Sequence, residues 1–247
     1  MVTAHHVDHG IRPESGSDAV RAAEIAEAIG VTFVVHRADV APGPNLEARA
    51  RVARLRLLPA DAMTGHTLDD QAETVLVRLL RGSGMTGLSA IEPGPRHPLL
   101  ALRRRDTEAV CTEIGIEPVR DATNDDASLW RSRVRHELLP LASEIAARDV
   151  APIIARTADM LREEDRLLDA LATEIDPTDA RAVAAAHPVL ARRALRLWLT
   201  VDGYPPDAAA IERVLGVAHG HATACELPGG RRLERSHQRF RIIAPDG

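Results

Sequence analysis

Strand-like and helix-like patterns alternate along the first half of the chain. Residues 31–36 are mostly β-branched or aromatic, which is typical of a strand, and residues 2–7 form a shorter strand candidate. Residues 61–64 predict a third short strand. Helices are predicted over residues 46–58 and 67–81, and over a stripe formed by Ala19, Ala22, Ala23, Ala26 and Ile29, which ends at Gly30. This alternation predicts an α/β fold with a parallel sheet and right-handed crossovers.

The pattern changes near Pro140. Residues 141–175 predict helices, and residues 189–200 and 207–218 predict two more. Residues 222–243 carry Pro-Gly-Gly between two strand-like runs, which predicts a hairpin. The predicted parts are an α/β domain over residues 1–140, a helical linker over 141–175, and a small, mainly helical C-terminal domain with a hairpin over 176–247.

Composition narrows the class of protein. Apolar residues make up 45% of the 247 residues, enough for a hydrophobic core. No run approaches the roughly 18 uninterrupted apolar residues of a membrane-spanning helix, and the N-terminal sequence lacks the basic and apolar regions of a signal peptide. We therefore expect a cytoplasmic protein with no membrane partner.

Charge and cysteine content exclude further classes. The net charge of −5 excludes a strongly basic nucleic-acid coat but allows a local basic patch. All 31 basic residues are arginine, a bias that a GC-rich genome produces, so arginine content alone carries little weight. The cysteines, Cys111 and Cys225, form no CxxC pair, which argues against a zinc ribbon, an iron–sulfur site or a disulfide framework.

The sharpest chemical signal is GHTLDDQAET, residues 65–74, which follows the third predicted strand and opens a helix. Ligands of parallel α/β sheets bind beyond the carboxyl ends of strands, where a helix N-terminus offers free N–H groups and a positive dipole end. Asp69, Asp70 and Glu73 can hold Mg²⁺ beside a nucleotide, or a substrate ammonium group. The alternative is ordinary capping of the helix, for which Thr67 and Asp70 are spaced as a capping box.

Two weaker signals flank this segment. His6, Asp8 and His9 lie at the carboxyl end of the first predicted strand, which suits a binding site, although no third cluster at ligand spacing supports a metal. The glycine-rich segment 81–88 follows the acidic helix. It is no Walker loop, because no Gly-Lys-Ser/Thr follows, and a helix end with a turn explains it equally well.

Arginines gather in three segments. They are Arg49, Arg51, Arg54 and Arg56 on a predicted helix; Arg131, Arg133 and Arg135 after the turn-rich residues 121–126; and Arg231, Arg232, Arg235, Arg239 and Arg241 in the predicted hairpin. The hairpin has five arginines against one acid, Glu234, a local charge of +4. Such groups can bind RNA phosphates. The alternatives are a solvated helix surface, a solvated loop, and charged edge strands that prevent aggregation.

The order of these segments resembles one known family. HVDHGIR, LEARARVAR, GHTLDDQAET with LLRGSG, HPLLALRR, DATNDD and RSRVRHELLP follow one another as in the tRNA(Ile)-lysidine synthetases. LPGGRRLERSHQRFRI is similar to the C-terminal substrate-binding element of that family. The resemblance is strong to about residue 140 and looser beyond; GHxxDD alone also fits related PP-loop enzymes that thiolate tRNA.

The resemblance implies both fold and reaction. Residues 1–140 would be a PP-loop ATP pyrophosphatase (adenine nucleotide alpha hydrolase-like) domain, and residues 176–247 a tRNA-binding and substrate-binding domain. Members of the family are ligases that use ATP and Mg²⁺ to adenylate the C2 oxygen of the wobble cytidine in a tRNA(Ile) with a CAU anticodon. The ε-amino group of free L-lysine then attacks C2, and AMP leaves. The resemblance is compatible with a homodimer.

Carried over by motif position, the resemblance assigns three groups of residues. The catalytic group is His66, Asp69, Asp70 and Glu73, in which the three acids handle lysine or metal and Asp70 is the candidate Mg²⁺ ligand. The ATP-binding group is His6, Asp8, His9, Gly65 and His66. The tRNA-binding group is Arg51, Arg54, Arg131, Arg133, Arg135, Arg231 and Arg232.

The chain departs from the family pattern at three places. The family begins with a strand and an SGGxDS-type loop that cradles the ATP pyrophosphate, whereas Met1 falls where the second strand of the family begins. The fold is therefore expected to be incomplete at its N-terminus, and the 247-residue chain is expected not to bind ATP productively. Leu55 stands where tyrosine is usual, and Ser132 where asparagine is usual.

Two other interpretations stay open. The chain can be a PP-loop enzyme that modifies tRNA in another way, such as a cytidine thiolase, although Cys111 and Cys225 are poorly placed for sulfur chemistry. It can also be a non-catalytic tRNA-binding remnant. The acidic cluster argues against that interpretation, because a protein that only binds phosphates gains nothing from Asp69, Asp70 and Glu73. The identity of the general base is left open.

Overall fold

The computed structural model describes most of the chain, which divides into two compact units, Met1–Ala158 and Asp159–Gly247. Residues 1, 9, 11–14, 39, 41–42, 44–45, 119–129, 202 and 245–247 lie outside the described residues, and so does the DATNDD segment. The division falls within helix α8 (Ala151–Thr173), so the boundaries proposed near residues 140 and 176 stay a prediction.

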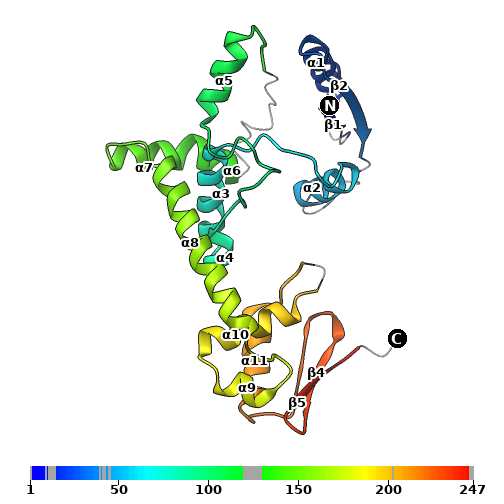
Figure 1. Ribbon diagram of the computed structural model, residues 1–247, viewed down its shortest axis with the longest axis vertical. Coiled ribbons are helices and arrows are strands. Elements are labelled where there is room, and N and C mark those ends of the chain that lie inside the picture. Colours follow the sequence, from blue (N-terminus) through cyan, green and yellow to red (C-terminus); the bar gives the residue numbers. More distant parts are fainter. Residues whose placement is uncertain are drawn as a thin grey trace. The chain divides into compact units, whose positions relative to one another are not determined.

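The N-terminal unit begins with a β–α–β element (Figure 1). Strands β1 (Thr3–Asp8) and β2 (Thr32–Arg37) pair in parallel. Helix α1 (Ser15–Ala28) connects them, and Gly30 follows it with a φ of 71°, the left-handed conformation that glycine adopts without strain. The predicted α/β class with a parallel sheet is confirmed by this element.

The predicted third strand over residues 61–64 is wrong. The segment is an irregular loop that leads into helix α3, and in the described part of the chain β1 and β2 alone make up the parallel sheet. A strand needs a neighbour along its whole length, whereas Thr64 donates one isolated backbone hydrogen bond to the carbonyl of Arg96 (2.8 Å). The segment is therefore tied to a loop rather than to a sheet.

Four helices follow in this unit: α2 (Leu46–Leu57), α3 (Leu68–Leu80), the short α4 (Met85–Leu88) and α5 (Arg104–Glu113). Helix α3 begins where the capping box predicts, because Asp70 accepts hydrogen bonds from the amide and the hydroxyl of Thr67 (both 2.8 Å). Its buried face carries Gln71, Ala72, Glu73 and Val75. An ionisable residue in that set requires partners from elsewhere.

A second helical segment packs against α3 through its first two elements. It consists of α6 (Trp130–Arg133), the π-helical turn η2 (Val134–Leu138) and α7 (Leu139–Ile145), with Pro140 in the first turn of α7. Figure 1 shows α6 and one end of α5 next to α3. Three sequence segments that are far apart along the chain therefore meet at the N-terminal half of α3.

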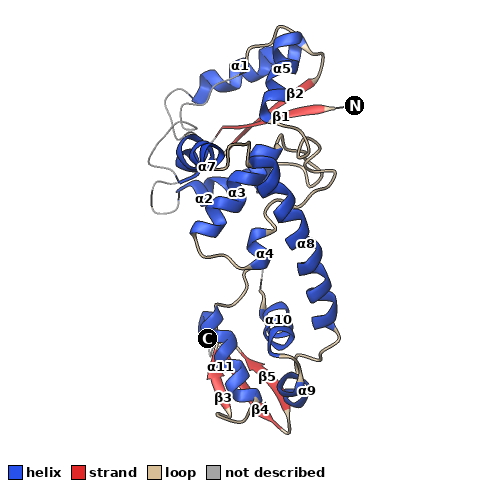
Figure 2. Ribbon diagram, turned by 90° about the vertical axis from the view of Figure 1, so that its left-hand side faces the viewer, coloured by secondary structure: helices blue, strands red, loops and turns tan. Residues whose placement is uncertain are grey.

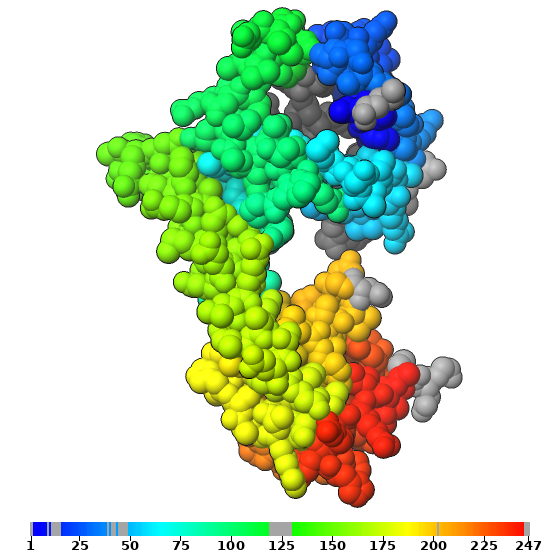
Figure 3. Space-filling model, viewed as in Figure 1, coloured from blue at the N-terminus to red at the C-terminus, as the bar shows by residue number. Residues whose placement is uncertain are grey.

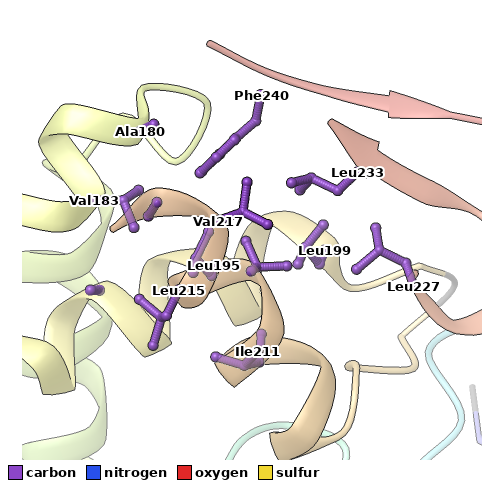
Figure 4. Close-up of a cluster of buried hydrophobic side chains, with 13 residues drawn as sticks. Ala180, Val183, Leu195, Leu199, Ile211, Leu215, Val217, Leu227, Leu233 and Phe240 are labelled. Carbon is purple, nitrogen blue, oxygen red and sulfur yellow. The ribbon is translucent and has the colours of Figure 1, made fainter. Parts of the chain in front are cut away.

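The C-terminal unit pairs helices with a small antiparallel sheet (Figure 2). Its helices are α9 (Ala180–Ala185), α10 (Pro188–Leu199) and α11 (Ala208–Ala218). Its strands, in the order β3–β4–β5, are β3 (Ala224–Glu226), β4 (Arg232–Ser236) and β5 (Arg239–Ile243). Leu195, Leu199, Val217, Leu233 and Phe240 form the buried centre between helices and sheet (Figure 4).

The predicted hairpin is present, but the sheet holds one more strand than the sequence indicated. The 3₁₀ turn η3 (Pro228–Gly230) joins β3 to β4 as expected. A second turn at His237 and Gln238 divides the following run into β4 and β5, with φ values of 49° and 65°. Two-residue hairpin turns of this kind usually carry Asn-Gly, so His-Gln gave no recognisable signal.

Candidate functional site

Asp69 on the first turn of α3 is bound by the residues that open α5. The guanidinium of Arg103 donates to Asp69 at 2.7 Å, and the backbone amide of Arg104 donates to its other oxygen, also at 2.7 Å. Burial alone favours the neutral acid, but these hydrogen bonds outweigh it and lower the pKa of Asp69. Arg103 also binds Asp149, so one guanidinium joins two carboxylates.

Asp70 is engaged on both of its oxygens. One oxygen accepts from Thr67 in the capping box, and the other accepts from Arg131 (2.8 Å) and Arg104 (3.2 Å). Burial raises the pKa of this carboxyl less than the Thr67 hydrogen bonds and the arginine charges lower it. The carboxylate is thus ionised and already satisfied by protein groups.

Glu73 is the most enclosed member of the group. The residue is 0% exposed, and three guanidinium groups surround its carboxylate. Arg135 donates to both oxygens (2.7 and 3.0 Å), Arg131 donates to one (2.9 Å) and Arg104 to the other (3.1 Å). A buried carboxylate is tolerated only with such pairing, so Glu73 orders three arginines around itself.

These residues form one unit, which we call the carboxylate–arginine cluster. Its members are Asp69, Asp70, Glu73, Asp149, Arg103, Arg104, Arg131 and Arg135. Four carboxylates face four guanidinium groups, so the formal charge of the cluster is zero. A substrate ammonium group would therefore replace an arginine contact rather than enter an empty acidic pocket.

The predicted arginine triplet is divided by the helix. Arg131 and Arg135 are four residues apart and face Glu73, whereas Arg133, between them, pairs with the exposed Glu137 (2.8 Å). Residues at i and i+4 share a helical face and residue i+2 does not. The tRNA-binding role of these arginines stays a prediction, and Arg133 alone is directed away from the cluster.

The candidate metal site does not fit these carboxylates. Both oxygens of Asp70 are occupied by Thr67 and by guanidinium groups. Among the residues that the structure describes, no three His, Cys, Asp or Glu side chains are grouped so that they could hold a metal ion. Mg²⁺ prefers several free oxygen ligands in octahedral geometry, so no step of the chemistry is assigned to a metal at Asp70.

Sequence reasoning missed three members of the cluster: Arg103, Arg104 and Asp149. Arg103 and Arg104 lie in the HPLLALRR segment and occupy the N-terminus of α5, where the helix dipole disfavours positive charge. Arginines at that position signal an acidic partner elsewhere. Nothing local identifies Asp149 as part of the site, because its partner Arg103 lies 46 residues earlier.

A second arrangement involves His66. The hydroxyl oxygen of Thr64 lies 2.6 Å from Nδ1 of His66 and 2.8 Å from Nδ1 of His97, and the two rings meet edge to face at 5.2 Å. Burial lowers the pKa of His66, and the charge of Asp70 raises it in part. His97 was not among the predicted residues.

Gly65, between Thr64 and His66, is exposed and needs no left-handed conformation.

One of the predicted nucleotide residues at the end of β1, Asp8, has a local partner. Asp8 accepts a hydrogen bond from the amide of Gly10 (2.8 Å), and His6 is half-buried. His9 lies outside the described residues. His5, the neighbour of His6, stacks on His36 of β2 with a nitrogen–nitrogen distance of 2.9 Å. The ATP-binding roles of His6, Asp8 and His9 stay predictions.

The remaining predicted tRNA contacts differ in their surroundings. Arg51 and Arg54 are exposed on α2, and the charge of Arg51 lowers the pKa of His97, after burial and the charge of Arg96. Strands β4 and β5 lie side by side at the surface (orange to red in Figure 3). Arg232 on β4 is exposed and pairs with Glu234 (3.1 Å), while the half-buried Arg231 donates to the carbonyl of Pro228 (3.2 Å).

Two other arginines of the hairpin bind groups within the C-terminal unit. Arg235 donates to the carbonyl of Ala218 (2.9 Å), and Arg239 pairs with Asp176. The +4 charge of the hairpin is thus partly used within the C-terminal unit. Arg231 and Arg232 keep their predicted role as a hypothesis.

Comparison with known proteins places this site in a family. Residues 1–142 match the model of the PP-loop domain, the class of ATP-using domain that the resemblance implied. The tRNA(Ile)-lysidine synthase of Nocardia farcinica is 39% identical over 259 aligned positions, which cover 98% of this chain and 80% of that protein. The enzyme of the same name from Rhodococcus erythropolis is 43% identical, covering 82% and 67%. This chain belongs to the tRNA(Ile)-lysidine synthase family, whose members are carbon–nitrogen ligases.

A solved structure supports the fold alone. The U34-tRNA thiolase NcsA from Methanococcus maripaludis, with its [4Fe-4S] cluster, superposes with a TM-score of 0.51 at 17% sequence identity, covering 65% of this chain and 62% of that one. Such a likeness carries no argument for thiolation. In the described helices, no stretch is long and apolar enough to cross a membrane.

Proposed function

We propose that this protein ligates free L-lysine to C2 of the wobble cytidine in a tRNA(Ile) with a CAU anticodon, at the expense of ATP. The carboxylate–arginine cluster carries the proposal. It gathers side chains from GHTLDDQAET, HPLLALRR and RSRVRHELLP, three segments of the family pattern, at the N-terminal half of α3. A meeting of three separate family segments in one place indicates a shared chemical task.

The reaction needs positive charge and a base. The C2 oxygen bonds to the α-phosphate of ATP, the bond between the α- and β-phosphates breaks, and pyrophosphate leaves. The AMP group is then the leaving group at C2, and its departing phosphate oxygen is negatively charged. The amine nitrogen of lysine forms a bond to C2, the C2–O bond breaks, and the ammonium proton must be lost before attack. Arginine N–H groups suit the phosphate, and a neutral imidazole such as that of His66 suits the proton.

The members of the carboxylate–arginine cluster differ in exposure, which separates side chains that can contact substrate from side chains that position others. The side chains of Arg131 and Arg104 are 40% and 31% exposed, so each can bind a phosphate while it remains paired with Glu73. The side chain of Glu73 is 1% exposed and is assigned to positioning these arginines. Asp69 and Asp70 have 17% and 14% of their side chains exposed, more than Glu73, and a lysine ammonium group that binds either of them would replace an arginine contact.

Two further components belong to the proposal. Mg²⁺ is expected to arrive with the ATP phosphates, because its usual protein partners are one or two carboxylates together with substrate phosphates, and no step is assigned to it. A homodimer remains part of the hypothesis, and the mass of the native protein in solution, measured by light scattering, would decide between one copy and two.

The proposal is tested with the native gene product purified from cells that express it. The protein is incubated with ATP, isotope-labelled lysine and a tRNA(Ile) transcript, and the nucleoside at the wobble position is identified by mass. We expect labelled lysine on the wobble cytidine of the CAU transcript. We expect no label when ATP is omitted, and none in a transcript with uridine at the wobble position. Incorporation of sulfur would support a thiolase instead, and tRNA binding without any modification would support a non-catalytic remnant.

A further inference from the structure

Thr64 joins two histidines that lie on different segments of the N-terminal unit. Its hydroxyl oxygen is within hydrogen-bond distance of Nδ1 of His66 (2.6 Å) and of Nδ1 of His97 (2.8 Å). The backbone holds this arrangement, because the amide of Thr64 donates to the carbonyl of Arg96 (2.8 Å) and so fixes the neighbouring His97 beside it. The three side chains are therefore held by more than their own contacts.

The chemistry of a hydroxyl couples the two rings. Thr64 has one O–H donor and two lone pairs, and a neutral imidazole has one N–H and one acceptor nitrogen. When Thr64 donates to one Nδ1, the other Nδ1 must be the protonated nitrogen that donates to Thr64. In that arrangement the two neutral histidines have opposite tautomers, and a shift of two protons through the hydroxyl exchanges them.

We propose that His66, Thr64 and His97 form a proton relay that removes the proton lost by the attacking amine. This inference rests on the proposed ligation of lysine. Nε2 of His66 accepts the ammonium proton, and His66 passes its Nδ1 proton to the Thr64 oxygen. Thr64 passes its own proton to Nδ1 of His97, which releases its Nε2 proton to water. His66 is thus the general base, and His97 acts through it.

The charges around the relay fit this direction. The carboxylate of Asp70 acts on His66 and stabilises an incoming proton there, whereas Arg131, Arg51 and a charged His97 oppose it. Arg96 and Arg51 face His97 and favour loss of its proton. For both rings, burial is the largest influence and lowers the pKa. At neutral pH the resting state is therefore a pair of neutral imidazoles.

The coupling is tested by NMR titration of the histidine ring nitrogens, which needs no catalytic activity. In the wild type, the Nδ1 signals of His66 and His97 should indicate opposite tautomers, and protonation of either ring should move the signals of both. Thr64→Val should abolish this mutual effect, and Thr64→Ser should restore it. His97→Gln should raise the pKa of His66 by a measurable amount, while His219→Gln, a control in the C-terminal unit, should not change it.

The catalytic role is tested by the pH dependence of single-turnover lysine incorporation. Thr64→Val is expected to slow the reaction about 10- to 100-fold, less than the roughly 10²–10⁴-fold loss of a general base itself, because His66 can still accept the proton. The variant should also shift the pH profile, with Thr64→Ser close to the wild type. Normal incorporation by Thr64→Val with an unchanged profile would overturn the relay and leave the proposed function intact. No incorporation by the native gene product would overturn both, even if the NMR coupling were present.

Discussion

Glu73 in the N-terminal unit and Leu195 in the C-terminal unit are both completely buried, yet different forces hold them. Leu195 lies among apolar side chains such as Val214 and Leu233, where burial itself is favourable. Glu73 lies among three guanidinium groups, where burial is costly and pairing offsets the cost. The comparison separates a part of the molecule built for stability from a part built to hold charges in defined positions.

The largest effect is expected when the buried charge is removed. Glu73→Ala leaves three guanidinium groups without their common partner and should destabilise the N-terminal unit by about 3 kcal/mol, at the lower end for broken buried pairs because the arginines keep some contact with water. Thermal unfolding measures this. The matched control is Glu137→Ala, which breaks an exposed, solvent-screened pair with Arg133 and should leave the unfolding temperature close to that of the wild type. Equal effects of the two variants would contradict the assigned role of Glu73.

An apolar truncation in the other unit should be almost as large but different in kind. Leu195→Ala removes a fully buried side chain and should cost about 2–5 kcal/mol. Because the lost interactions are apolar, the cost should depend little on pH between 4 and 8. Hydrogen exchange resolved by residue should locate the destabilisation in α10, α11 and the sheet, and strong loss of protection in α3 instead would contradict the division into units.

A smaller and more selective effect separates two neighbouring arginines. Arg131→Ala removes a contact of both Asp70 and Glu73 and should reduce lysine incorporation about 10- to 100-fold. Arg133→Ala removes an exposed side chain and should leave the single-turnover rate unchanged. If Arg133 contacts a phosphate of the tRNA, Arg133→Ala should weaken tRNA binding a few-fold. The slope of the logarithm of the binding constant against the logarithm of the salt concentration should then fall in magnitude by about one. The two parameters are measured by single-turnover kinetics and by binding at several salt concentrations.

Acid should weaken the cluster gradually. The pKa values of Asp69 and Asp70 are lowered in the folded protein, so between the unfolded value of about 3.9 and the folded values the unfolded chain binds more protons. Stability is therefore fully present above this window and is lost as the pH falls through it. Asp69→Asn should lose less stability than the wild type between pH 5 and pH 3, and an equal loss would show that Asp69 contributes nothing to the acid sensitivity.

Local sequence patterns predicted those parts of the site that depend on local structure. The capping box at Thr67 and Asp70 and the helix that carries Glu73 follow from residues within four positions of one another. The pairing of Glu73 with Arg135 spans 62 residues, and no periodicity or propensity encodes it. The family resemblance predicted the order of the segments that carry Glu73 and Arg135, but only the fold brings the two side chains into contact.

The failures have the same origin. Residues 61–64 contain only one β-branched residue, Thr64, and have no neighbouring strand, so neither composition nor pairing supports a strand there. His97 had no signal of its own, since only the fold brings it to Thr64. The alternation of Arg131, Arg133 and Arg135 looked like one basic group, and the helix directs its middle member to the opposite side.

The claim that Glu73 positions arginines, rather than binding lysine, is tested most directly by the steady-state kinetics of Glu73→Gln. The amide keeps the size of the side chain and removes the charge that orders Arg104, Arg131 and Arg135. We predict a fall in kcat of about 10- to 100-fold with the KM for lysine within about a factor of three of the wild type. A large rise in the KM for lysine with kcat unchanged would contradict the account and would make Glu73 a ligand of the substrate amine.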